Sequence, residues 1–82
     1  MPTDHDTDDP GFRVYSPASL GTAVRHYRHA AGLSQAQLAA RVGVHRSYLS
    51  DLERGKETEQ LRRILHLLKE LGVRMTIGEA EW

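Results

Sequence analysis

Apolar residues between positions 17 and 71 recur at intervals of three and four, the spacing that places side chains on one face of a helix. The first such segment covers residues 17–31, with Leu20, Val24, Tyr27 and Ala31 on one face. Ser16 before it is suited to cap a helix, the following proline suits the first helical position, and a glycine comes directly after the segment. The pattern therefore predicts a first helix over residues 17–31.

Two shorter helices are predicted next. Ser34 and Gln37 form a capping-box pattern that opens the second helix, and Gly43 ends it. Its expected apolar stripe is Ala36, Leu38, Ala39 and Val42. Only Val44 separates this glycine from a third helix over residues 45–54. The expected inward positions of the third helix are Tyr48, Leu49 and Leu52.

A fourth helix is predicted over residues 58–71, ended by Gly72. Its apolar side chains cover an arc of about 160°, which is wider than one neighbouring helix needs in a chain of four helices. Residues 73–77 then alternate between apolar and polar side chains as a strand does. Another short β-prone run lies at residues 12–15. The pattern as a whole predicts an all-α domain with one short strand near its C-terminal end.

Composition narrows the class of protein. The chain of 82 residues is 39% hydrophobic and 27% charged, which indicates one small globular domain. Residues 1–12 are acidic and poor in apolar side chains, so we expect a flexible tail there. The absence of cysteine excludes disulfides, thiolate zinc sites and thiol nucleophiles. Because the apolar runs are too short for a membrane span or a signal peptide, we expect a cytoplasmic protein without membrane contact.

Charge is distributed unevenly along the chain although the net charge is zero. Residues 1–12 carry a charge of −4, residues 13–56 carry +5, and residues 57–82 carry −1. A locally basic segment can meet a phosphate backbone whatever the net charge of the chain. The charge alone is equally compatible with bases that merely solvate helix faces.

Two short helices joined by a turn that contains glycine match the helix-turn-helix arrangement. Gly43 permits the turn, Ala39 is small enough for the helices to cross closely, and Val44 and Leu49 are expected to fill the space between them. In this arrangement the first residues of the second helix touch base edges in the DNA major groove. The residues predicted to read bases are His45, Arg46, Ser47, Ser50 and Asp51.

Particular side chains suit particular DNA groups. The guanidinium of Arg46 can contact guanine O6 and N7 together, whereas Asp51 can accept from a cytosine amine or pair with Arg54 one turn on. Gln35 lies in the first turn of the second helix, where helix N–H groups favour a phosphate. The residues predicted to contact phosphates are Ser34, Gln35, Arg54 and Lys56.

Residues 33–56 resemble the helix-turn-helix of the Cro/C1 (XRE) family of bacterial and phage regulators. The resemblance rests on Ser34-Gln35, Leu38-Ala39, Gly43-Val44, Leu49-Ser50 and the ending Leu52-Glu53-Arg54-Gly55-Lys56. It implies a lambda-repressor-like domain of four main helices that binds an inverted-repeat operator in double-stranded DNA. The domain is expected over residues 13–72, with the strand at 73–78 and a tail at 79–82.

A narrower resemblance connects the chain with the HipB-like antitoxins, which pair with HipA-like kinase toxins. It rests on Val14-Tyr15-Ser16-Pro17, on the run Leu71-Gly72-Val73-Arg74-Met75-Thr76-Ile77 and on the final Glu81-Trp82. The resemblance implies base contact by His45, Arg46, Ser47 and Ser50, phosphate contact by Gln35, and an intertwined dimer. An antitoxin that represses its own operon, neutralises a HipA-like kinase and associates with the nucleoid on its operator is therefore expected.

The predicted homodimer follows from the lone strand, whose edges lack a long partner within the chain. The residues assigned to dimerisation are Leu67, Leu71, Val73, Met75 and Ile77. Pairing of the strand with residues 12–15 of the same chain is the rival arrangement. Trp82 is predicted to contact the kinase as an exposed aromatic anchor, and the alternative is that it folds back onto the sheet of its own dimer.

Other functions receive less support from the residues. The chain has no nucleophile elbow and no glycine-rich phosphate loop, so we expect no enzyme and no cofactor. His26 and His29 lack a third ligand at metal-binding spacing, so surface histidines are expected rather than a metal site. A regulator without a toxin partner, a helical scaffold and an interaction module that no longer binds DNA remain as alternatives.

Overall fold

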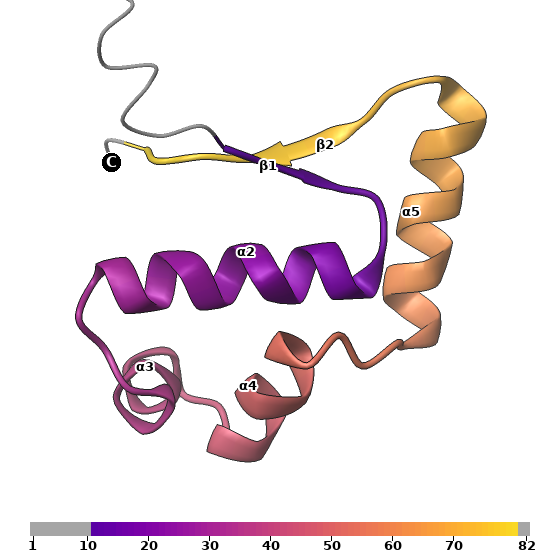
Figure 1. Ribbon diagram of the computed structural model, residues 1–82. Helices are drawn as coiled ribbons and strands as arrows, with labels where there is room; N and C mark the ends of the chain where they lie inside the picture. Colours follow the sequence, from indigo (N-terminus) through magenta and orange to yellow (C-terminus); the bar gives the residue numbers. More distant parts are fainter. Residues whose placement is uncertain (1–10, 81–82) are drawn as a thin grey trace, which may run out of the picture.

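The computed structural model describes residues 11–80, and within them the four predicted helices are confirmed (Figure 1). The elements in chain order are β1 (Phe12–Val14), α2 (Pro17–Ala30), α3 (Gln35–Val42), α4 (Arg46–Glu53), α5 (Glu59–Leu71) and β2 (Met75–Ile77). The strand predicted at residues 73–77 is shorter than expected and keeps only its last three residues. No helix in the described part is long and apolar enough to cross a membrane.

The predicted caps form at the helix ends. Ser16 accepts a hydrogen bond from the backbone N–H of Ser19, whose hydroxyl in turn accepts from the backbone N–H of Ser16. Ser34 and Gln37 form the same reciprocal pair at the start of α3. Gly43 ends α3 with φ of 76°, a left-handed backbone conformation that residues other than glycine rarely adopt. These caps satisfy backbone groups that would otherwise lack partners.

Helix α2 is the central element, with β1 on one side of it and α4 on the other (Figure 1). Gly21, buried in the middle of α2, lies against the C-terminal end of α4. A Cβ atom at this position would lie 2.4 Å from the carbonyl oxygen of Leu52 and 2.7 Å from that of Glu53. Only a glycine therefore lets α2 and α4 approach this closely.

The core is small and is made by short side chains. Four apolar residues are buried in the described structure, one each from β1, α2, α3 and α4: Val14, Ala23, Ala39 and Leu49. Because an eight-residue helix offers few inward positions, α3 and α4 each bury one residue. The helix-turn-helix is thus fixed to α2 by few apolar contacts.

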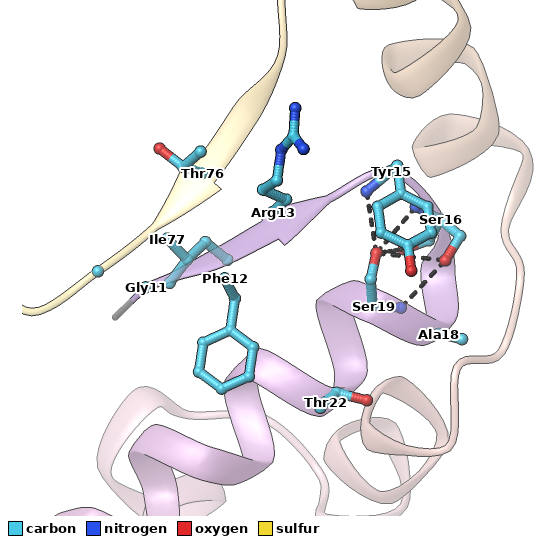
Figure 2. Close-up of a pocket in the computed structure, with 11 residues that line it drawn as sticks. Gly11, Phe12, Arg13, Tyr15, Ser16, Ala18, Ser19, Thr22, Thr76 and Ile77 are labelled. Carbon is cyan, nitrogen blue, oxygen red and sulfur yellow. Dashed lines mark hydrogen bonds between the residues drawn. The ribbon is translucent and has the colours of Figure 1, made fainter. Parts of the chain in front are cut away.

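The two strands pair with each other inside the chain. β1 and β2 are antiparallel, with Phe12 opposite Ile77 and Val14 opposite Met75. This is the rival arrangement, so the strand is not alone but has a short partner of three residues within its own chain. Figure 2 shows Phe12 extending from β1 towards α2, while Arg13 extends to the other side of the ribbon. The ribbon thus has an apolar face over α2 and a polar outer face.

Helix α5 projects from the rest of the molecule beyond the end of α2 (Figure 1). None of its residues is buried. Leu67 and Leu71 are 58% and 66% exposed, and Ile64 is exposed as well. The wide apolar arc predicted for this helix is therefore confirmed as a surface that the single chain leaves uncovered.

Four apolar residues of the helix-turn-helix that were predicted to face inward are exposed, and the smallest of them is Ala36. Tyr48 is 59% exposed, and Val42 and Val44 also lie at the surface. Of the residues in α4, only Leu49 is buried, because a helix of eight residues offers few inward positions. The expectation that Val44 helps to fill the interface between the helices is therefore wrong.

Candidate nucleic-acid interface

Helices α3 and α4 form the helix-turn-helix that the sequence predicted. The turn runs from Gly43 through Val44 to His45, which is the N-cap of α4. Val44 donates its backbone N–H to the carbonyl of Ala39, 3.0 Å away. Ala39 and Leu49 are buried, so the two helices are packed together and the N-terminal end of α4 is free to project.

The residues predicted to read bases lie on α4 and at its N-cap. His45, Arg46 and Ser47 are exposed, and the side chain of His45 forms no capping hydrogen bond. Ser50 and Asp51 lie one turn further along and are half-buried. Arg46 has no ion pair among the described residues, so its guanidinium is available for a ligand.

Asp51 pairs with two of the residues predicted to contact phosphates. Its Oδ1 lies 2.5 Å from Arg54 Nη2, and its Oδ2 lies 3.4 Å from Lys56 Nζ. Of the two interpretations left open for Asp51, the structure contains the pair with Arg54. The carboxylate holds both cations at the C-terminal end of α4 and leaves this cluster with a charge of +1.

Gln35 is connected to a buried ion pair that the sequence pattern did not predict. Its Nε2 donates to Glu53 Oε1 at 3.0 Å. Arg28 donates from Nε and Nη2 to the same carboxylate at 2.6 and 2.8 Å, and from Nη1 to the carbonyl of Leu33 at 2.8 Å. The Arg28 and Glu53 side chains are 9% and 3% exposed. This network joins the end of α2, the start of α3 and the end of α4.

The position of this ion pair did have a signal in the sequence. Arg28 follows Val24 by four residues, and Glu53 follows the buried Leu49 by four. Both charges therefore continue the inward faces of their helices, where an unpaired charge is costly. The pairing of two positions 25 residues apart, however, depends on the crossing of α2 and α4.

Electrostatics keep the pair ionised. The hydrogen bonds from Arg28 hold the pKa of the Glu53 carboxyl below its ordinary value, and the Gln35 hydrogen bond acts in the same direction against the effect of burial. The hydrogen bond to Glu53 raises the pKa of the Arg28 guanidinium. A carboxylate that stays ionised is a strong acceptor for the Gln35 amide.

The start of α3 carries the other predicted phosphate contacts. Ser34 is exposed, and its hydroxyl accepts from the backbone N–H of Gln37 at 3.0 Å. The Gln35 amide nitrogen gives one hydrogen to Glu53 and retains a second. Ser34 and Gln35 are therefore fixed at the N-terminus of α3, and Arg54 and Lys56 are held by Asp51 beyond the end of α4.

The residues assigned to dimerisation fall into two groups. Leu67, Leu71 and Val73 are exposed, whereas Met75 and Ile77 are half-buried on β2.

Trp82, the predicted kinase contact, lies outside the described residues, as does most of the acidic N-terminal tail. Within residues 11–80 no group of three or more histidine or acidic side chains could hold a metal ion.

Comparison with known proteins identifies a family, and it finds similarity to a transcriptional regulator and to an antitoxin. A family model described as helix-turn-helix domain matches residues 19–75. An uncharacterized HTH-type transcriptional regulator, y4mF of Sinorhizobium fredii (strain NBRC 101917 / NGR234), is 38% identical over 65 residues, which are 79% of this chain and 86% of the relative. Antitoxin HipB of Escherichia coli (strain K12) is 28% identical over 69 residues, which are 84% of this chain and 78% of the relative. No solved structure matches the chain.

Proposed function

The chain belongs to the helix-turn-helix domain family and is a DNA-binding regulator of the Cro/C1 type that resembles HipB. We propose that it represses its own operon as a homodimer and that it neutralises a HipA-like kinase. The observation that carries the DNA-binding part is the free N-terminal end of α4, where His45 and Arg46 are exposed while the helix itself packs against α2 and α3. The kinase part is supported by the likeness to antitoxin HipB.

Base reading is assigned to the exposed side of α4. Arg46 is placed to contact a guanine, and its guanidinium is not engaged by a carboxylate in the described structure. His45, Ser47 and Ser50 surround it as shorter hydrogen-bonding side chains. Asp51 contributes indirectly, because it orients Arg54 and Lys56, and it can accept from a cytosine amine if those cations turn to phosphates.

Phosphate contacts position the domain on the duplex. Ser34 and Gln35 present the first turn of α3, where free backbone N–H groups favour an anion. Arg54 and Lys56 present two cations beyond the other end of the motif. These contacts carry no sequence information, so their loss weakens binding to all duplexes in a similar way.

The homodimer is supported by the surface that one chain leaves open. Leu67, Leu71 and Val73 form an exposed apolar face on α5 and the segment after it. β1 occupies one edge of β2, and its second edge can pair with the partner's β2 to make a four-stranded sheet. A two-fold dimer places the two α4 helices about 34 Å apart, one turn of DNA.

A binding titration tests the DNA-binding proposal. The full chain is added to labelled DNA from upstream of its own gene and to a scrambled duplex of the same base composition, at one salt concentration. Tighter binding to the upstream DNA, protection of an inverted repeat and a stoichiometry of two chains per site are expected. Equal affinity for both duplexes would mean that the domain does not read sequence.

Neutralisation of a kinase has its own test. A kinase-sized reading frame beside the gene is expected, and expression of that kinase alone should arrest growth unless this chain is expressed with it. The higher identity to a relative named only as a transcriptional regulator favours one second candidate, a regulator without a toxin partner. Operator binding without an adjacent kinase gene would support that candidate.

A further inference from the structure

A groove of about 230 Å³ lies between the strand ribbon and the C-terminal half of α5. Its apolar lining comes from both sides: Val14, Leu65, Leu68 and Met75. Tyr15 and Val73 also line the groove, and both are largely exposed. The groove is thus an apolar hollow at the end of the exposed α5 face, and the single chain leaves it open.

Two cations stand beside the apolar lining. Lys69 and Arg74 line the groove and are exposed, and neither has an ion pair within residues 11–80. An apolar hollow flanked by two positive charges fits a segment that combines an aromatic side chain with an acid.

The chain carries such a segment a few residues after β2. Gly78 and Glu79-Ala80 are followed by Glu81 and Trp82, which lie outside the described residues. Trp82 is the single tryptophan of the sequence, and Glu81 directly precedes it. The segment therefore provides one large apolar group and an adjacent negative charge.

We propose that residues 79–82 of each chain occupy this groove on the other chain of the homodimer. The inference rests on the homodimer proposed above. If the two β2 strands pair antiparallel with Thr76 at the two-fold axis, Gly78 of one chain lies opposite residue 74 of the other, and residues 79–82 continue towards the C-terminal end of the other chain's α5. Lys69 and Arg74 line the groove at this end of α5, so the arrangement brings Glu81 near two cations and Trp82 near the apolar lining.

The groove of the same chain is poorly placed for this segment. β2 runs from Met75, which lines the groove, to Ile77, which is about 7 Å further away. Residues 79–82 span about 13 Å when fully extended, so they would have to reverse direction at Gly78 and use most of their length to return. Antiparallel pairing between two chains brings the segment there without a reversal.

This arrangement places Trp82 inside the free homodimer. It selects the second of the two alternatives given for this side chain, in which it packs on its own dimer. A kinase that used Trp82 as an anchor would first have to displace it from the groove.

Trp82 fluorescence reports the occupancy of the groove directly, because there is no other tryptophan. In the full-length wild-type dimer we expect blue-shifted emission that acrylamide quenches poorly. The double variant Lys69→Glu, Arg74→Glu should shift the emission to the red and make it readily quenched. Arg41→Glu, a charge reversal at an exposed cation on α3 that does not line the groove, should leave the emission unchanged.

A mixing experiment tests whether the contact is between chains. Excess Trp82→Phe chain, which has an intact groove and no tryptophan, is equilibrated with the Lys69→Glu, Arg74→Glu chain. Return of blue-shifted, protected emission is expected, because Trp82 of the variant then enters an intact groove on its new partner. Emission that stays red-shifted would overturn the exchange of segments.

Light scattering on the same samples separates this inference from the homodimer itself. A dimeric wild-type protein whose Trp82 is fully accessible to acrylamide would overturn the docked segment and leave the homodimer in place. A monomer at micromolar concentration would overturn both.

Discussion

The guanidinium of Arg28 forms two hydrogen bonds with the carboxylate of Glu53, and these join the last turn of α2 to the last residue of α4. The same carboxylate accepts from Gln35 at the start of α3. One ion pair therefore fixes both helices of the helix-turn-helix relative to the central helix. A domain with only four buried apolar residues in its described part depends strongly on such a connection.

Replacement of Glu53 by Gln should destabilise the fold. The neutral amide leaves the Arg28 guanidinium buried without a counter-charge, and removing one partner of a buried pair is costly. We expect the melting temperature to fall on the order of 10 °C. Glu59→Gln, which removes the exposed pair with Arg63, is the control and should change it little. Equal effects of the two substitutions in thermal unfolding would contradict this role.

The same pair predicts a specific pH dependence. Because the pKa of Glu53 is lowered in the folded state, its contribution to stability is complete above the ordinary glutamate value of about 4.3 and is lost as the pH falls through the folded value. The difference in melting temperature between wild type and Glu53→Gln should thus be largest near neutral pH and shrink towards pH 3. A difference that stays constant over this range would show that the carboxylate charge does not stabilise the fold.

Gly21→Ala should destabilise the protein although alanine is the better helix former. A Cβ at this position would lie 2.4 Å from the carbonyl oxygen of Leu52, so α2 and α4 would have to move apart. The exposed neighbouring substitution Thr22→Ala is the control and should have little effect on thermal unfolding. A melting temperature raised by Gly21→Ala would mean that the helices are not in close contact here.

Whether a feature of the fold could be predicted from the sequence depends on how far apart along the chain the interacting residues lie. Ser34, Gln37 and Gly43 mark the helix ends through contacts within a few residues, and those ends were predicted closely. The exposure of Tyr48 was not predicted, because the face that an eight-residue helix buries depends on how closely the neighbouring helices pack against it. Gly21 decides that distance from another helix, and no periodicity in α4 reveals it.

The candidate site shows the same division. His45, Arg46 and Ser47 could be placed on one exposed end because the turn at Gly43 is local. The partner of Gln35 could not, since Glu53 lies 18 residues away and reaches it only through the packing of α3 on α4. β2 pairs with β1 from the opposite end of the domain, and the sequence predicted this pairing only as an alternative to pairing between two chains.

Substitutions at the two helix N-termini should have different effects on DNA binding. Arg46→Ala should cost about 1–3 kcal/mol at the operator and relax the preference at one base pair, because the base contact is lost. Gln35→Ala should weaken binding to operator and scrambled DNA more evenly, because a phosphate contact is lost. Titration of both variants on both duplexes decides this. Losses for Arg46→Ala that are equal on the two DNAs would contradict its role in reading bases.

The uncovered face of α5 gives the last prediction. Leu71→Asp places a charge on a side chain that is 66% exposed in the single chain, so the monomer fold has no reason to lose stability. In a homodimer the same aspartate is buried without a partner, which should shift the protein to monomers that keep their helices but bind the operator weakly. The control is Arg62→Asp, which introduces the same aspartate on the same helix but outside the apolar arc, and it should leave the protein dimeric. Light scattering after gel filtration and circular dichroism measure the two properties separately. A Leu71→Asp protein that remains dimeric would place the dimer interface away from α5.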